Sequence, residues 1–230
     1  MPETALKRLA IVGYGKMGHL IDQMAEQYGF HVVLRVDAPT AGAAPLKGVD
    51  VAIEFSTPAS AVANIEWLAH RRIPVVVGTT GWYDQLDHVR DIVTRHGSAL
   101  VWSPNFSIGV NVFERLVSEA ARLLATEPAY GAWAWEIHHS TKKDAPSGTL
   151  LKLVQAMKRA GFDRPVDTAS NRAGAHPGTH EIGFDSLADT ITLRHAARGR
   201  EGFASGALKA AQWIIGRTGC HEFSEVLFGR

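Results

Sequence analysis

Residues 9–18 read LAIVGYGKMG, a short apolar run that ends in a glycine-rich loop. The apolar run is typical of a buried strand, and the residues after the loop place apolar side chains at helical spacing. Between the two, Gly13, Gly15 and Gly18 form the pattern G-x-G-x-x-G. Glycines at these positions permit a tight turn and let backbone N–H groups approach a pyrophosphate at the helix start. The stretch therefore predicts a strand, loop and helix that bind a dinucleotide.

The alternation of strand and helix continues through residue 105. In the segment 57–72, Thr57 is expected to cap a helix that has Pro58 at its first position. Regular alternation indicates a parallel, doubly wound Rossmann sheet of the α/β class. The weakest connection in this part is 38–47, which is rich in Pro, Ala and Gly. Further strands are predicted at 31–37, 49–56, 74–80 and 99–104, and helices at 57–72 and 83–97.

An acidic residue, Asp37, ends the second predicted strand. Its spacing from the glycine loop is that of the acid that binds the ribose hydroxyls in dinucleotide-binding folds. A carboxylate there would repel a 2′-phosphate, which favours NADH over NADPH. Lys16 and Arg35 are basic residues that could still receive that phosphate, so both cofactors stay open.

The pattern changes after residue 105 and predicts an inserted α+β domain, 106–205, for substrate binding and oligomerisation. The last helix is expected to return to the dinucleotide-binding domain, which then comprises 1–105 and 206–230. The helices of this half are predicted at 108–127, 150–161 and 202–218, and the strands at 132–139 and, as an antiparallel pair, at 180–186 and 189–197.

The overall composition limits the class of protein. Among 230 residues, Lys and Arg number 24 and Asp and Glu 23, so the net charge of +1 argues against nucleic acid or an anionic membrane as partner. The single cysteine, Cys220, excludes an intramolecular disulfide and a multi-cysteine zinc site. We find no signal peptide and no run of 18 apolar residues, so a cytoplasmic protein is expected.

Residues 136–150 read EIHHSTKKDAPSGTL and crowd titratable side chains before a predicted helix. Ser147 or Thr149 can cap that helix, whose free N–H groups attract an anion such as a carboxylate. His138 and His139 alternate faces of a strand, and a histidine beside a lysine can supply positive charge and protons near neutral pH. Each feature alone is more often structural. No metal site is expected, since the two histidines are adjacent and no carboxylate pair completes a ligand set.

The stretch 136–149 closely resembles the signature E-x-H-H-x-x-K-x-D-A-P-S-G-T of the dihydrodipicolinate reductase (4-hydroxy-tetrahydrodipicolinate reductase) family of the diaminopimelate–lysine pathway. Every fixed position is present. The glycine loop is shorter than in many members, which leaves the preference between NADH and NADPH open. Further similar stretches lie, in order, at 50–58, 75–82, 103–113, 171–184 and 202–214, so that the resemblance covers essentially the whole chain.

The resemblance implies a Rossmann domain, a second domain with a mixed sheet, and a homotetramer formed through that sheet. It implies that NADH or NADPH reduces a cyclic imine dicarboxylate, with His138 as proton donor and acceptor and Lys142 as proton donor. Substrate would be bound by His139, Ser147, Gly148 and Thr149. The implied cofactor residues are Gly13, Tyr14, Gly15, Lys16, Met17, Gly18, Asp37, Gly78, Thr79, Thr80, Ser103, Pro104, Asn105 and Phe106.

Two rival hypotheses explain part of the sequence. Another NAD(P)-linked oxidoreductase, such as an amino-acid dehydrogenase, would account for the glycine loop and not for the histidine–lysine motif. A catalytically silent dinucleotide-binding regulator would need neither His138 nor Lys142. Cofactor binding without turnover would identify the regulator.

Overall fold

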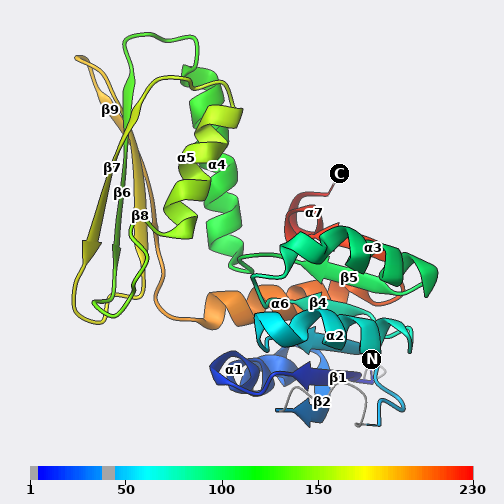
Figure 1. The fold of residues 1–230 in the computed structure, drawn as a ribbon. Coiled ribbons are helices and arrows are strands. Elements are labelled where there is room, and N and C mark those ends of the chain that lie inside the picture. The colour runs from blue at the N-terminus through cyan, green and yellow to red at the C-terminus, as the bar shows by residue number, and fades with distance from the viewer. Residues whose placement is uncertain (1–4, 38–44, 230) are drawn as a thin grey trace. The chain divides into compact units, whose positions relative to one another are not determined.

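Six parallel strands form a sheet in the order β10-β5-β4-β3-β1-β2 (Figure 1). The strand order reverses at β1 and β3, which are adjacent in the sheet. The computed structural model describes residues 5–37 and 45–229. This sheet confirms the predicted Rossmann-type fold. In such folds, ligands bind beyond the carboxyl ends of the strands, at the point where the strand order reverses. The strands are β1 (Lys7–Val12), β2 (Phe30–Val36), β3 (Val51–Glu54), β4 (Val75–Val77), β5 (Ala99–Trp102) and β10 (Gly219–Glu222).

Helices cover both faces of this sheet because its central strands are apolar on both sides. Leu9 and Ile11 of β1 share a core with α1 and α6, whereas Ala10 and Val12 share a core with α2 and α3. Short 3-10 turns follow α1 and precede α3, at Glu26–Tyr28 and Tyr83–Gln85. The helices are α1 (Lys16–Ala25), α2 (Pro58–Ala69), α3 (Leu86–Arg95) and α6 (Glu201–Ile214).

Two details of this sheet differ from the prediction. The helix predicted at 202–218 ends at Ile214, and the chain then forms the edge strand β10 and a short helix, α7 (Phe223–Phe228). Gly216, at a φ of +80°, adopts the left-handed conformation that ends helices. Thr57 stands at the N-cap of α2 but makes no capping hydrogen bond, since its hydroxyl pairs with that of Ser60 at 2.9 Å.

The chain divides into two compact units, residues 1–108 with 201–230 and residues 109–200. The sequence placed these boundaries a few residues away, at 105/106 and 205/206. Of the predicted connection 38–47, residues 38–44 lie outside the described part of the chain. Among the described residues, no helix combines the length and apolar character that a membrane crossing requires.

The second unit is built on a four-stranded mixed sheet in the order β7-β6-β8-β9. β6 pairs parallel with β7 and antiparallel with β8, and β8 pairs antiparallel with β9, which confirms the predicted antiparallel pair. The sequence did not predict β7, whose side chains VDTASNR are mostly polar and exposed. The strands are β6 (Gly131–His138), β7 (Val166–Arg172), β8 (Thr179–Asp185) and β9 (Thr190–Ala196).

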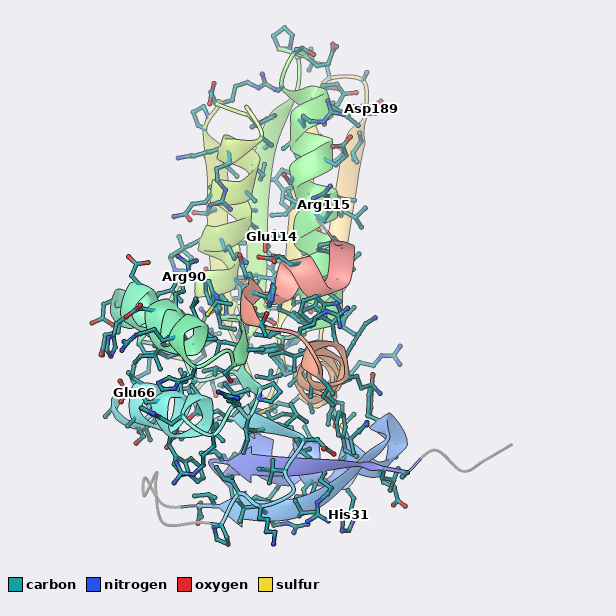
Figure 2. The ribbon with its side chains drawn as sticks, turned by 90° about the vertical axis from the view of Figure 1, so that its right-hand side faces the viewer. His31, Glu66, Arg90, Glu114, Arg115 and Asp189 are labelled. Atoms are coloured by element: carbon teal, nitrogen blue, oxygen red, sulfur yellow. The ribbon has the colours of Figure 1, made fainter. Side chains whose placement is uncertain are left out.

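Two helices, α4 (Ile108–Leu124) and α5 (Gly148–Arg159), contribute to the apolar core on one face of this sheet. Ala132 and Ala134 of β6 point into that core, while Trp133, Trp135 and Ile137 lie on the other face. Glu114, labelled on α4 in Figure 2, forms an ion pair with Lys152 of α5 at 2.9 Å. Because side chains alternate along β6, the sheet has a covered face, on which Ala132 and Ala134 meet the core, and an open face with Trp133, Trp135 and Ile137.

Candidate active site

The glycine loop between β1 and α1 needs glycine at two positions for steric reasons. Gly13 has a φ of +89°, and a Cβ atom there would lie 2.2 Å from the carbonyl oxygen of Phe55. A Cβ atom on Gly18 would lie 2.4 Å from the carbonyl oxygen of Gly13. Gly15 differs, because a Cβ atom there would meet nothing within 4 Å. Gly15 is the N-cap of α1 and has no side chain to occupy the helix start.

A cleft of about 470 Å³ opens beside this loop in the first unit. It brings together six predicted cofactor residues from the ends of β1 and β4. The sequence analysis missed three lining residues that follow β3 at the same sheet edge. Their position after a predicted strand was the available signal. Gly78 fits beneath the Phe55 ring, which lies 2.1 Å from the position of a Cβ atom there. The lining residues are Gly15, Lys16, Met17, Phe55, Ser56, Pro58, Gly78, Thr79 and Thr80.

A charged cluster lies next to the loop, between α1 and β2. The Arg35 guanidinium donates two hydrogen bonds to the Asp22 carboxylate, at 2.6 and 2.8 Å, and the Tyr14 hydroxyl donates another. The Arg35 hydrogen bond lowers the pKa of Asp22 below its ordinary value. Arg35 is thereby engaged by an acid, while Asp37 is exposed directly after β2.

The predicted residues 103–106 follow β5 and form a hydrogen-bonded turn. The Ser103 hydroxyl donates to the Asn105 carbonyl oxygen at 2.8 Å and accepts from the Asn105 N–H at 3.1 Å. Phe106 is only 2% exposed and packs against Phe223, with ring centroids 4.8 Å apart. Its side chain is therefore part of the core, and its carbonyl oxygen packs against Gly206, where a Cβ atom would lie 1.8 Å away.

In the second unit, polar side chains form a row across the covered face of the sheet. Strand register places Ser170 of β7 and His180 of β8 on either side of Glu136 of β6. His138 and Arg172 are neighbours two residues further along their strands. Because side chains two apart in a strand share a face, Glu136 and His138 both point to the covered side.

Glu136 is completely buried and charged. Burial by itself would raise its pKa, but hydrogen bonds from Ser147, Arg172 and Ser170 outweigh that effect and lower the pKa to about 2. The Ser147 N–H, the Ser170 hydroxyl and the Arg172 guanidinium donate to its Oε1 at 2.8, 2.9 and 2.9 Å. A buried carboxylate with three donors on one oxygen is held in a single orientation.

Burial favours the neutral form of both histidines of the row. Burial lowers the pKa of His138 below its ordinary value, although Glu136 opposes part of the shift. Burial and the proximity of His138 lower the pKa of His180 to about 4. The His138 ring edge packs on Gly178, where a Cβ atom would lie 3.0 Å from both Cδ2 and Nε2.

The remaining motif residues lie on the loop between β6 and α5. The Lys142 ammonium lies 2.8 Å from the Asp144 carboxylate and its side chain is 25% exposed, so the charge stays accessible. The hydrogen bond from Lys142 lowers the pKa of Asp144. His139 leaves the covered face and contacts the Thr141 hydroxyl at 2.7 Å. Lys143 is exposed.

Ser147 is the residue that caps α5. Its Oγ accepts a hydrogen bond from the Leu150 N–H at 3.2 Å and contacts His180 Nε2 at 3.2 Å. Gly148 and Thr149 form the first turn, where N–H groups attract anions. The loop, the cap and the buried row therefore meet at one end of the sheet.

Three of these groups also have the spacing of a metal site. One ligand atom from each of Glu136, His138 and His180 lies within 4.8 Å of the other two. Two histidines and a carboxylate are ligands that zinc and iron accept. The expectation of no metal overlooked this set because His180 reaches it only through strand pairing. The Arg172 guanidinium already balances the same carboxylate at 2.9 Å.

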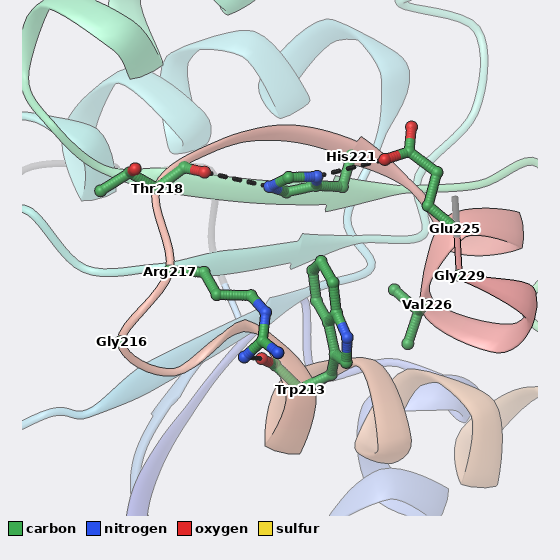
Figure 3. Close-up of a pocket in the computed structure, with 8 residues that line it drawn as sticks. All are labelled: Trp213, Gly216, Arg217, Thr218, His221, Glu225, Val226 and Gly229. Carbon is green, nitrogen blue, oxygen red and sulfur yellow. Dashed lines mark hydrogen bonds and ion pairs between the residues drawn. The ribbon is translucent and has the colours of Figure 1, made fainter.

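A second hollow, of about 550 Å³, lies along the edge strand β10 (Figure 3). Arg217 stacks over the Trp213 ring at 4.3 Å and donates to the Trp213 carbonyl oxygen at 2.7 Å. His221 contacts the Thr218 carbonyl oxygen at 3.0 Å and the Glu225 carboxylate at 3.3 Å. Among the lining residues that the structure describes, no buried polar side-chain atom lacks a hydrogen-bond partner.

Comparison with known proteins identifies the family. Models described as the N-terminus and the C-terminus of dihydrodipicolinate reductase match residues 7–106 and 109–227. The chain belongs to the dihydrodipicolinate reductase family. This confirms the family expected from the motif at 136–149.

Relatives in this reductase family match along the full chain. The 4-hydroxy-tetrahydrodipicolinate reductase of Christiangramia forsetii is 35% identical, over 95% of this chain and 97% of the relative. That of Archaeoglobus fulgidus is 34% identical, over 90% and 93%. The solved structure of a dipicolinate-bound dihydrodipicolinate reductase from Paenisporosarcina sp. TG-14 has a TM-score of 0.77 at 21% identity and covers 94% of this chain and 97% of that one. The structural likeness supports the shared fold.

Proposed function

We propose that this protein catalyses the NAD(P)H-dependent reduction of 4-hydroxy-tetrahydrodipicolinate to tetrahydrodipicolinate in diaminopimelate and lysine biosynthesis. Its family and the reductases most similar to it support this reaction. The observation that carries the proposal is the intact motif at 136–149, in which His138 lies over a buried carboxylate and Lys142 stays accessible. Neither rival hypothesis accounts for that arrangement.

The cleft beside the glycine loop is the proposed dinucleotide site. NAD(P)H supplies a hydride when it is bound. The open space at Gly15 and the free N–H groups at the start of α1 suit the pyrophosphate. The loops at 78–80 and 103–106 follow β4 and β5 at the same sheet edge and would line the rest of the cofactor.

The loop between β6 and α5 is the proposed substrate site. A ring carbon that accepts a hydride builds up negative charge on its neighbours, which must then be protonated. The Lys142 ammonium would stabilise that charge and donate the proton from Nζ. The N–H groups of Gly148 and Thr149 and the side chain of His139 would bind the substrate carboxylates, and His138 would exchange a proton with the reacting molecule.

NADH is the proposed preferred cofactor. The exposed Asp37 carboxylate would repel a 2′-phosphate, and Arg35 is already engaged by Asp22. Lys16 remains exposed in the cleft. The kcat/KM ratio of NADH to NADPH decides this point, and a ratio below one would contradict it.

A homotetramer assembled through the open face of the mixed sheet is the proposed assembly. Trp133, Trp135 and Ile137 lie half-buried on that face. Register places Glu181 beside Trp135 on the same face, where it pairs with Arg194 at 3.1 Å. Aromatic side chains half-exposed among polar groups are typical of an interface between subunits.

A coupled assay tests the reaction. Aspartate semialdehyde, pyruvate and a dihydrodipicolinate synthase generate the substrate in place, and loss of NADH or NADPH absorbance reports turnover. Oxidation that requires both enzymes is the expected result. Oxidation that is absent while the nucleotide still binds would favour the silent regulator.

Lysine variants then test the proton donor. Lys142→Ala is expected to lower kcat at least ~100-fold and to leave nucleotide affinity unchanged. Lys143→Ala removes the same charge from the adjacent exposed position and is the matched control. Equal activity of the two variants would refute the role of Lys142.

A further inference from the structure

The Glu136 carboxylate has one satisfied and one unsatisfied oxygen. Its Oε1 accepts all three hydrogen bonds that hold the group. Its Oε2 is buried without a hydrogen-bond partner. Burying a carboxylate oxygen without a hydrogen-bond donor costs free energy, so the group toward which that oxygen points is informative.

Oε2 points to the proposed catalytic histidine. It lies 3.4 Å from His138 Nδ1, an atom that is also buried without a hydrogen-bond partner. Oε2 lies equally far, 3.4 Å, from His180 Nε2, but that nitrogen has the Ser147 hydroxyl as a second contact. The pair of unsatisfied atoms is therefore Oε2 and Nδ1. Hydrogen bonds of catalytic groups are often long in the free protein and shorten in the complex.

We propose that Glu136 is the positioning residue of His138. Its Oε2 accepts a hydrogen bond from Nδ1–H, fixes that tautomer and leaves Nε2 as the atom that exchanges protons. The neutral ring takes a proton at Nε2 from the reacting molecule and becomes an imidazolium facing Oε2. It returns to neutral when Nε2 releases that proton to solvent. This inference rests on the proposed function, because it assigns a partner to His138 within that reaction.

The surrounding groups keep Glu136 in this role. Arg172 balances the charge of the carboxylate at Oε1 and leaves Oε2 free. The Ser147 N–H on the same Oε1 belongs to the cap of α5, so one carboxylate holds both the histidine and the start of the proposed substrate helix. Gly178 lies against the Nε2 side of the ring and has no Cβ atom, which would come within 3.0 Å of Nε2.

Glu136→Gln tests the inference because the donors around the Oε1 position decide how the amide is oriented. The Ser147 N–H and the Arg172 guanidinium can only donate, so the amide oxygen must occupy the Oε1 position. The amide NH₂ is then forced to the Oε2 position, where it donates to His138 Nδ1 and imposes the opposite tautomer. We expect kcat to fall at least ~100-fold while KM stays within about threefold, as for other histidines held in the wrong tautomer.

The matched control is Glu114→Gln, which removes a paired carboxylate from the same unit, away from the row. It is expected to retain the kcat of the wild type. A purely structural role for Glu136 would lower the melting temperature of Glu136→Gln and would leave the kcat of the folded variant near normal. The inference would be overturned if Glu136→Gln and Glu114→Gln had equal kcat values, or if Glu136→Gln changed KM alone.

Nitrogen NMR of the His138 ring gives a readout that does not depend on turnover, and its wild-type measurement does not require the variant to fold. In the wild type, Nδ1 is expected to carry the proton, and in Glu136→Gln, Nε2. A wild-type ring protonated at Nε2 would overturn the inference, and so would stoichiometric zinc in the purified protein that Glu136→Gln loses. An inactive wild type in the coupled assay with Nδ1 protonated would instead refute the proposed function.

Discussion

Gly13 and Gly15 lie in one loop, but only Gly13 must be glycine for steric reasons. Substitution with alanine can distinguish the role of each residue. Gly13→Ala is expected to destabilise the fold by several kcal/mol, since its left-handed backbone and a Cβ contact at 2.2 Å both oppose a side chain. Gly15→Ala has free space and is expected to keep the melting temperature. It should weaken NADH binding at least ~10-fold, because the methyl group would meet the pyrophosphate. Thermal melting and nucleotide titration of both variants measure this, and full nucleotide affinity of Gly15→Ala would remove the loop from the cofactor site.

His180 predicts how stability responds to acid. Its folded pKa of about 4 is below the ordinary value of 6.5, so the unfolded chain binds a proton first as the pH falls. Stability from this group is present above pH 6.5 and is lost progressively between pH 6.5 and 4, by about 2 kcal/mol from pH 7 to 5. Urea unfolding at these two pH values measures it.

His180→Gln should reduce that pH dependence, because glutamine binds no proton. His31→Gln, at an exposed position of β2, is the control and should keep it. An unchanged pH dependence in His180→Gln would show that other groups cause the loss.

The residues of the buried row show what the sequence could predict at this scale. The spacing of Glu136 and His138 by two on a strand already places both on one face. Ser170, Arg172 and His180 reach the same carboxylate through the register of β6 with β7 and β8. Register between strands depends on tertiary packing, so no local pattern revealed these three partners.

At the scale of elements, the N-cap of α5 joins stability to the proposed site. Sequence alone left Ser147 and Thr149 as alternative caps, and the structure assigns the cap to Ser147. Ser147→Ala should lower the free energy of unfolding by about 1 kcal/mol, whereas Thr149→Ala should lower it by less. Chemical denaturation compares the two. A larger loss in Thr149→Ala would contradict the assigned cap.

The elements that sequence patterns missed share a physical cause. β10 has four residues, too few to display a period, and it pairs only along one side, with β5. β7 is a polar edge strand whose exposed side chains do not follow the apolar alternation of a half-buried strand. The central strands of the Rossmann sheet were predicted because burial on both faces requires continuous apolar runs.

At the scale of the whole molecule, the open face of the mixed sheet is the proposed interface between subunits. Trp133 lies over Gly183 of the neighbouring strand, where a Cβ atom would come within 2.1 Å of the indole. The Trp135 indole donates to Asn171 at 2.6 Å. Both aromatic rings are thereby fixed on the open face, which would lower the entropy lost if a second subunit docked there.

Trp135→Arg tests whether this face assembles the homotetramer. An arginine in place of the indole removes aromatic contact area and must be desolvated on docking, so the variant is expected to elute as a smaller species while it keeps its fold. Leu123→Arg, at a 58% exposed residue of α4, is the matched control and should keep the wild-type mass. Light scattering coupled to size-exclusion chromatography measures both masses. If the wild type is monomeric, or if Trp135→Arg keeps the wild-type mass, then the tetramer does not form through this face.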